Sequence, residues 1–325
     1  MLRWSTVPVL RRVEPFVLAI LAAVAVAALL PAGGAFATGL SWGTTVGVGL
    51  LFFVHGARMA PAEALRGLHD WRLQGSVALT TYVLFPLLGV LLVLATGRFL
   101  GEGLAAGLLF LAVLPSTVQS SVVFTAQAGG NVPGAVVSAT ASNLAGVGFT
   151  PLLAALLLGS TGAGPDAGSI GRIILQLLVP FLVGLAAGRF VGGWVRRHRR
   201  PLSSLDRGVI VAVVYAAFSR GVRQGVWQQV GPLEVAVVVG CAALLLAAVL
   251  AATWWAPRLW GASRPDRVTT VFCGSNKSLA TGLPMATVLF DPHVVGLVAL
   301  PVVLYHPLQI TVCSFLAGRM ALARP

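Results

Sequence analysis

Long apolar runs, separated by short polar or glycine-rich gaps, follow one another along the whole chain. About 20 apolar residues are needed to cross the hydrocarbon core of a bilayer, so repeated runs near this length predict a polytopic helical membrane protein. We therefore expect an all-α integral membrane protein with ten transmembrane helices. The predicted segments are Phe16–Leu30, Thr44–Met59, Trp71–Leu94, Glu102–Ala128, Val132–Leu158, Ser169–Arg189, Leu202–Gly221, Leu233–Trp255, Arg267–Leu289 and His293–Met320.

The fourth and ninth segments differ from the others because polar residues, glycine or proline interrupt them. They occupy the same place in two successive sets of five, residues 1–158 and 159–325. Since five is odd, the second set enters the membrane with inverted orientation. Matched interruptions of this kind are the best pointer in a sequence to the substrate site of a transporter. The alternative is that glycine and proline are simply common in membrane helices.

Composition agrees with this interpretation and adds an orientation. The 325 residues are 57% hydrophobic and 10% charged, with a formal net charge of +13 and a mean hydropathy of +0.92. The basic residues lie mostly in short gaps between apolar runs and form no basic helix, which argues against nucleic acid as a partner. Arginines are denser in one alternate set of gaps, so we expect both termini to be cytoplasmic and the protein to lie in the cell membrane. The richer gaps contain Arg58, Arg66, Arg72, Arg196, Arg197, Arg199, Arg200, Arg207, Arg258, Arg264 and Arg267.

Polar side chains gather at both interruptions. The first cluster follows Pro115, which frees a backbone carbonyl one turn earlier, and it includes Gln119, Ser120 and Ser121. The second cluster is Gly274-Ser275-Asn276-Lys277-Ser278. If the two segments cross, their helix ends face one another. Exposed amide ends there would attract anions, and exposed carbonyl ends would attract cations.

A third polar group lies on the segment after the first interruption. It contains Ser138, Ser142 and Asn143, and Ser138 and Ser142 share one helix face. Each of these residues is either a ligand of a substrate or ion, or a partner in a hydrogen bond between helices.

Lys277 is the only lysine in the chain, and it lies within an apolar stretch. A cation at membrane depth is costly and indicates a functional site. Lysine, unlike arginine, can lose its proton when it is removed from water. The alternative is a lysine that extends to the membrane surface.

The acidic residues support a transporter rather than an enzyme. All nine fall in loops or near the ends of predicted segments, so a Na⁺ site within the membrane would rely on neutral oxygens. No metal-ligand spacing and no nucleophile–base motif stands out. We interpret His55 and His306 as packing or hydrogen-bonding residues.

Five stretches of the chain resemble the bile acid:sodium symporter superfamily, in its SBF-like branch of sodium-dependent transporters. The resemblance covers nearly the whole chain. Its most specific stretches are Phe52–Arg58, Leu114–Ser121, Gly130–Pro133, Ser138–Asn143 and Val271–Ser278.

The resemblance implies two inverted five-helix repeats that together form a core domain, with crossed broken helices, and a panel domain that moves against it. In sodium-coupled members, polar residues of the broken helices and of the helix after the first one bind Na⁺. Matched by position, the Na⁺ ligands here would be Ser120, Ser121, Ser275 and Asn276, with Ser138 or Ser142 beside them.

Two departures from the family pattern concern the coupling ion. A glutamate central to Na⁺ binding in the family falls on Phe272, and an asparagine falls on Lys277. A lysine ammonium there repels Na⁺. We therefore expect a protein that is proton-coupled, or not ion-coupled, rather than Na⁺-coupled. In the proton-coupled case, loading and unloading a proton replaces binding and release of Na⁺.

The function expected from the sequence is therefore secondary active transport of a small organic anion through the lipid bilayer, coupled to Na⁺ or H⁺, without a cofactor. The alternative is a non-transporting regulatory or scaffold protein that retains the transporter fold. The expected substrate-binding or ion-binding residues are Gln119, Ser120, Ser121, Ser138, Ser142, Asn143, Ser275, Asn276, Lys277 and Ser278. No sequence feature indicates an oligomeric state.

Overall fold

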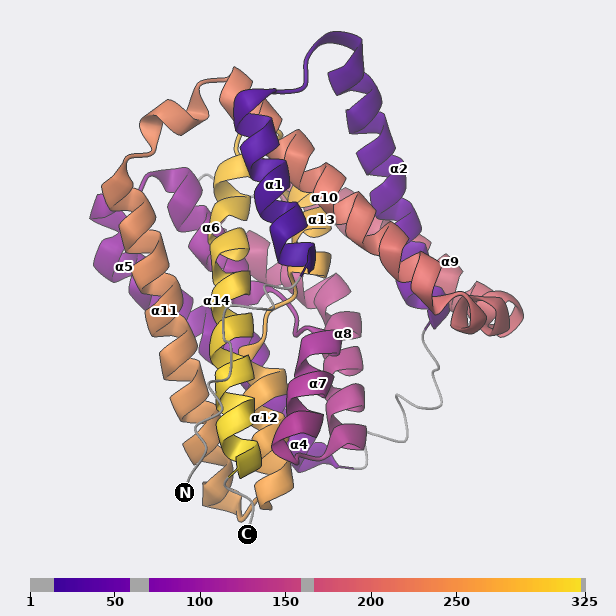
Figure 1. The fold of residues 1–325 in the computed structure, drawn as a ribbon, viewed down its shortest axis with the longest axis vertical. Helices are drawn as coiled ribbons and strands as arrows, with labels where there is room; N and C mark the ends of the chain where they lie inside the picture. Colours follow the sequence, from indigo (N-terminus) through magenta and orange to yellow (C-terminus); the bar gives the residue numbers. More distant parts are fainter. Residues whose placement is uncertain (1–14, 59–69, 159–166, 323–325) are drawn as a thin grey trace, which may run out of the picture.

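The computed structural model describes residues 15–58, 70–158 and 167–322, and these residues form an assembly of helices without any strand (Figure 1). The α-helices are α1 (Pro15–Leu29), α2 (Gly34–Arg58), α4 (Trp71–Leu79), α5 (Phe85–Thr96), α6 (Glu102–Val113), α7 (Val118–Ala128), α8 (Val132–Leu158), α9 (Ala167–Arg197), α10 (Arg199–Arg223), α11 (Pro232–Trp255), α12 (Arg264–Ser275), α13 (Leu279–Leu289) and α14 (Val295–Leu322). A π-helical turn, η2 (Thr80–Leu84), joins α4 to α5. Short 3₁₀ turns η3 (Gly97–Phe99), η5 (Val226–Gln229) and η6 (Ala256–Trp260) follow α5, α10 and α11.

Seven helices of the described chain are long and apolar enough to cross a membrane, and the bent pair α6–α7 makes an eighth candidate. The prediction of an all-α integral membrane protein is therefore confirmed. α1 has only 15 residues and is therefore too short to count among these candidates, although it is apolar. The arrangement of ten spans in two inverted repeats stays a prediction.

The start of α2 differs from the sequence prediction. The segment was expected to begin at Thr44, but the helix begins at Gly34. Glycine, threonine and serine lower the apolar character of residues 34–43, and this part is therefore read as a loop from hydropathy alone. Met59, the predicted end of the same segment, lies outside the described residues.

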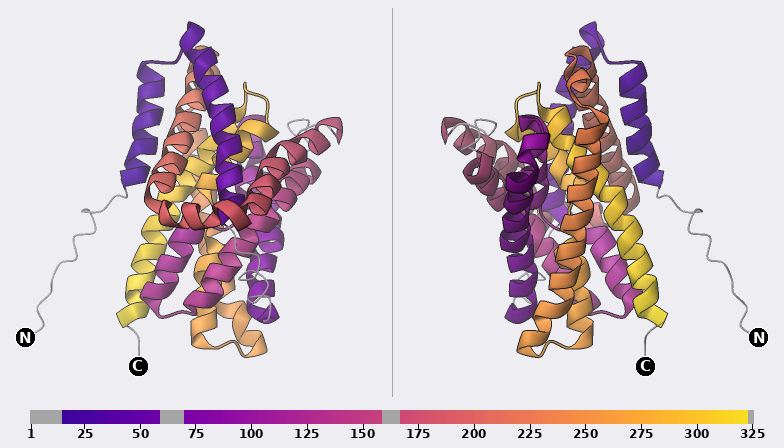
Figure 2. Two further views of the ribbon diagram at one scale, coloured as in Figure 1. Left: turned by 90° about the vertical axis from the view of Figure 1, so that its right-hand side faces the viewer. Right: turned by 90° about the vertical axis from the view of Figure 1, so that its left-hand side faces the viewer.

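Two glycines allow α2 and α9 to pack closely along each other. A Cβ atom at Gly56 would collide with the backbone of Phe181, and one at Gly184 would collide with the backbone of Phe53. Small residues at helix contacts let backbones approach in this way. Figure 2 shows the pair from two sides, with α9 tilted away from the other helices.

Both predicted interruptions are present. α6 and α7 are bent by 56° at the segment Leu114–Thr117. α12 and α13 are separated by Asn276, Lys277 and Ser278, and the backbone of Asn276 and Ser278 is extended. Each break leaves carbonyl groups at the end of one helix and amide groups at the start of the next without a partner in the helix.

Candidate functional site

The two helix interruptions contact each other directly. The backbone amide of Ser278 donates to the carbonyl of Pro115 at 2.8 Å. The hydroxyl of Thr117 donates to the carbonyl of Lys277 at 2.8 Å, and that of Ser116 to the carbonyl of Cys273 at 2.6 Å. The interrupted segments therefore meet, as the sequence predicts, and each supplies hydrogen-bond partners to the other.

Lys277 reaches from the second interruption into the first. Its side chain is 1% exposed. Its Nζ donates to the carbonyls of Thr81, Ala112 and Leu114 at 3.0, 2.8 and 2.7 Å, and it lies 4.0 Å from the centroid of the Phe85 ring. The alternative in which this lysine extends to the membrane surface is therefore wrong.

Asn143 of α8 connects both interruptions. Its Nδ2 donates to the carbonyl of Ser116 at 2.6 Å, and its Oδ1 accepts from the hydroxyl of Thr281 at 2.9 Å. One turn of α8 thus fixes the start of α7 relative to the start of α13. The neighbouring Ser142 accepts from the amide of Ser116 at 3.0 Å, whereas the buried hydroxyl of Ser138 has no hydrogen-bond partner.

The four oxygens that the resemblance assigns to Na⁺ are only partly brought together. Asn276 Nδ2 donates to Ser121 Oγ at 3.2 Å, and Ser121 Oγ donates to the carbonyl of Phe272 at 3.0 Å. Ser275 Oγ lies 3.9 Å from the sulfur of Cys313. The hydroxyl of Ser120 is buried without a hydrogen-bond partner. Their role in holding Na⁺ stays a prediction.

Phe272, where the resemblance implies a glutamate, is fully buried in an apolar cluster. Its ring lies 5.8 Å from the ring of Phe124, and Val268, Val271 and Ala317 belong to the same cluster. Among the described residues no group of three or more His, Cys, Asp or Glu side chains is close enough to hold a metal ion.

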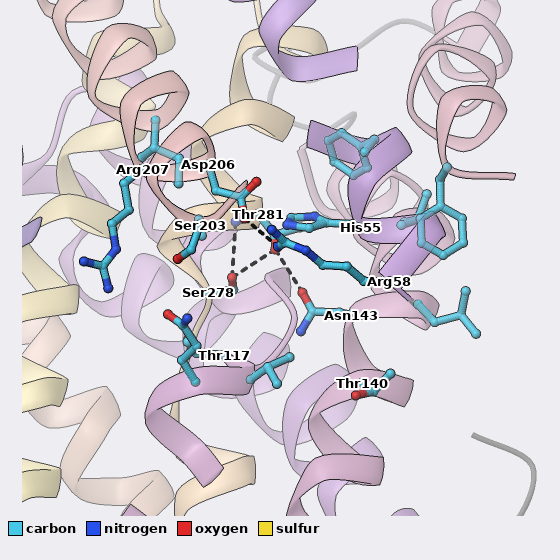
Figure 3. Close-up of a pocket in the computed structure, with 18 of the residues that line it drawn as sticks. His55, Arg58, Thr117, Thr140, Asn143, Ser203, Asp206, Arg207, Ser278 and Thr281 are labelled. Atoms are coloured by element: carbon cyan, nitrogen blue, oxygen red, sulfur yellow. Dashed lines mark hydrogen bonds and ion pairs between the residues drawn. The ribbon is translucent and has the colours of Figure 1, made fainter. Parts of the chain in front are cut away.

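A pocket of about 350 Å³ lies beside the meeting point (Figure 3). The residues at the start of α7 and α13 contribute to its wall, among them Thr117, Gln119, Ser278 and Thr281. Of the ten candidate residues, Gln119, Asn143 and Ser278 line this pocket. Seven are not part of its lining, and they are Ser120, Ser121, Ser138, Ser142, Ser275, Asn276 and Lys277.

The opposite wall contains charged residues that the sequence analysis assigned to loops or segment ends. Arg58 of α2 donates from Nη1 to Oδ2 of Asp206 of α10 at 2.6 Å, although 148 positions separate them. Arg58 Nη2 and Asp206 Oδ1 are both buried, and neither has a hydrogen-bond partner among the described residues. Arg199 and Arg207 also line the pocket. No local sequence signal connects these residues, because the fold alone brings them together.

His55 contributes to the same wall of the pocket. Its ring stands edge-on to that of Phe52, with the centroids 6.3 Å apart. The interpretation as a packing residue is thus correct but incomplete, because the side chain also borders the cavity. His306 is a hydrogen-bonding residue, as interpreted, because its Nδ1 lies 3.0 Å from Nε2 of Gln309.

Two residues of α14 hold the second interruption and were missed. Gln309 Oε1 accepts from the amide of Lys277 at 2.8 Å, and Gln309 Nε2 donates to the carbonyl of Lys277 at 2.9 Å. The hydroxyl of Tyr305 donates to the carbonyl of Ser275 at 2.9 Å. A glutamine inside a run of apolar residues, with a tyrosine one turn earlier, was the available signal.

An all-helical membrane protein whose two interrupted segments meet beside a charged pocket has the architecture of a membrane transporter. The model of the SBF-like CPA transporter family matches residues 14–322, and the chain belongs to this family. It is 47% identical to the uncharacterized protein PA2026 of Pseudomonas aeruginosa over 313 residues, which cover 96% of this chain and 94% of that protein.

Two further relatives carry transporter names. The "Putative symporter YfeH" of Escherichia coli K12 is 42% identical over 311 residues, covering 95% of this chain and 93% of that protein. The "Sodium/bile acid cotransporter 7" of Xenopus tropicalis is 27% identical over 316 residues, covering 94% and 91%. The resemblance stated from the sequence is therefore confirmed, and the chain is a transporter by family.

Proposed function

We propose that this protein is a secondary active transporter that carries a small organic anion, coupled to a gradient of Na⁺ or H⁺. The observation that carries the proposal is the pocket of about 350 Å³, which borders the starts of two interrupted helices and a set of arginines. The family and the names of the relatives support transport. The choice of an anion rests on the charges of the lining.

Positive charge dominates the pocket. Its charged side chains are Arg58, Arg199 and Arg207 against Asp206 alone. The helix starts at Thr117 and Ser278 add partial positive charge, because their first amides have no partner within the helix. At α7 no side chain caps these amides. A carboxylate, sulfate or phosphate ester would accept hydrogen bonds from the guanidinium of Arg58, which lines the pocket, and from these amides.

The rest of the lining indicates an amphipathic ligand. Phe16, Phe52 and Phe181 form an aromatic wall, and Leu144, Val147 and Ile210 add aliphatic surface. A volume of about 350 Å³ lies at the lower end of the usual range for ligand pockets, about 300–1,000 Å³. The proposed substrate is thus a compact anion with one apolar face.

The position of the pocket supports alternating access. Its wall comes from α1, α2, α9 and α10 on one side and from α7, α8 and α13 on the other. We assign the first group to the panel domain and the second group to the core domain that the family resemblance implies. In this proposal the ten spans form two inverted repeats, residues 1–158 and 159–325, and movement of the panel against the core opens the pocket to either side.

The distribution of arginines supports a location in the cell membrane with both termini cytoplasmic. The coupling ion is proposed as H⁺ rather than Na⁺, because Lys277 already places a positive charge at the interruptions. The names of the cotransporter relatives favour Na⁺ instead. A non-transporting scaffold is less favoured, because both interruptions retain their polar side chains.

The test combines ligand binding with uptake by the purified full-length protein. A screen of monoanions and dianions for thermal stabilisation identifies a ligand, and its uptake into proteoliposomes is followed under an imposed Na⁺ or H⁺ gradient. Arg58→Gln should raise the Kd about tenfold, since a hydrogen bond to a charged group contributes about 1.5–3 kcal/mol and this guanidinium is partly exposed.

Arg197→Gln is the matched control, because this arginine lies at the end of α9 and does not line the pocket. It should leave binding and uptake unchanged. Binding that Arg58→Gln does not weaken would contradict the assignment of the pocket. Binding without accumulation under either gradient would favour the scaffold.

A further inference from the structure

The side chain of Lys277 occupies a cage of backbone oxygens. Its three N–H groups match three carbonyl acceptors, those of Thr81, Ala112 and Leu114, at 2.7–3.0 Å. The face of the Phe85 ring closes the cage. An ammonium group has three donors and no acceptor, so this arrangement satisfies the charged group completely. None of its partners is a carboxylate.

The carbonyl of Thr81 is available because of the π-helical turn. The amide of Phe85 bonds to the carbonyl of Thr80 and not to that of Thr81. The next residue, Pro86, has no N–H to donate. The carbonyl of Thr81 therefore has no donor within its own helix, and Lys277 supplies one from a segment 196 positions away.

The carbonyls of Ala112 and Leu114 are available because of Pro115. In a continuous helix the amide of Ser116 would bond to the carbonyl of Ala112, but here it donates to Ser142 Oγ at 3.0 Å. Leu114 lies beyond the last residue of α6 and has extended backbone. Both carbonyls lie at the end of α6, where the helix dipole favours a positive charge.

Carbonyl oxygens that converge at a helix end, beside an aromatic face, are the ligands expected for a monovalent cation. We propose that Lys277 is a tethered cation, which holds this position with its own ammonium group so that the two interruptions take up no alkali ion there. The side chain is covalently attached, so this cation cannot diffuse out of the site as a bound alkali ion would.

The meaning of this inference for transport rests on the proposed function, since a Na⁺ gradient cannot act through a position that Lys277 fills. The occupation of the carbonyl cage by Lys277 does not depend on any substrate. The test is therefore a stability measurement on the purified full-length protein, which succeeds or fails whether or not the protein transports an anion.

The experiment compares thermal unfolding in chloride salts of choline, sodium and methylammonium at one ionic strength. The melting temperature of the wild type should be the same in all three salts. Lys277→Ala should lower it by about 5 °C or more, because three buried carbonyls lose their donors. Sodium or methylammonium should restore at least half of this loss, since each brings a small monovalent cation to the vacated carbonyls, and the bulkier choline should restore none.

Lys277→Met is the matched control, because it fills the cage without a charge. It should be destabilised in all three salts, and no cation should restore it. Restoration of Lys277→Met by sodium would overturn the proposal, since the responsive site would then lie elsewhere. The wild-type measurement decides even if both variants fail to fold, because a saturable rise of its melting temperature with sodium would also overturn the proposal.

Discussion

The two helix interruptions occupy corresponding places in the chain but are stabilised by different chemistry. At the first, the carbonyls at the end of α6 are bound by a cationic ammonium, Lys277 Nζ. At the second, the carbonyls at the end of α12 are bound by neutral hydroxyls. These pairs are Ser121 with Phe272, Ser116 with Cys273, and Tyr305 with Ser275.

The direction of exchange is also different. The second interruption supplies the ammonium donor to the carbonyls of the first. The hydroxyls of the first interruption and of α7 donate to carbonyls at the end of α12. Hydrogen bonds to a charged group contribute about 1.5–3 kcal/mol, against about 0.5–1.5 kcal/mol for neutral groups. The stability of the first interruption should thus depend mainly on Lys277. The stability of the second should depend on several weaker hydrogen bonds, so that the loss of any one of them has a smaller effect.

Removing the charge gives the largest expected effect. Lys277→Met should destabilise the protein by about 3 kcal/mol or more, because three buried carbonyls lose their donor and each such loss costs about 1–3 kcal/mol. Ser116→Ala, which removes one donor instead of three, should cost less in the same denaturation assay. Equal losses for the two variants would show that the interruptions are stabilised alike and would remove the distinction between them.

Removing single hydroxyls should sharpen the comparison at the second interruption. Ser116→Ala and Ser121→Ala each leave a buried carbonyl without this donor, at an expected cost of about 1–3 kcal/mol. The measurement is thermal unfolding of each variant. Ser120→Ala is the matched control, on the same helix as Ser121, because the buried hydroxyl of Ser120 has no hydrogen-bond partner within the described structure. Its effect should be near zero or stabilising.

The sequence predicts the interruptions and the importance of Lys277 because these signals are local. Pro115 followed by a run of polar residues favours a helix break, and a sole lysine in an apolar run indicates a functional site. Its partners could not be predicted, because Thr81 is available only through a π-helical turn followed by Pro86. Hydropathy does not distinguish that turn from an ordinary α-helix.

The pocket shows where local reasoning ends. Gln119, Asn143 and Ser278 belong to the polar clusters and were found. Arg58 and Asp206 were interpreted as charges at segment ends, where arginine and aspartate are common. Their pairing joins α2 to α10, so it depends on packing between distant helices. Gln309 was missed although it lies inside a predicted segment. A single polar residue in an apolar helix usually indicates a contact between helices, and nothing local connects it with Lys277.

The smallest expected effect concerns the link between the interruptions. Asn143 Oδ1 accepts from the hydroxyl of Thr281, while Asn143 Nδ2 donates to the carbonyl of Ser116. If this asparagine connects the two starts, Asn143→Ala and Thr281→Val should be non-additive in unfolding free energy, with a coupling of about 1 kcal/mol. The double-mutant cycle isolates this contact from the other bonds of Asn143. Ser120→Ala combined with Thr281→Val is the additive reference, because no hydrogen bond involves Ser120 Oγ. Additivity of the Asn143 pair would mean that this asparagine does not couple the two interruptions. Their relative position would then be fixed by the ammonium of Lys277, the hydroxyls of Ser116 and Thr117 and the amide of Ser278.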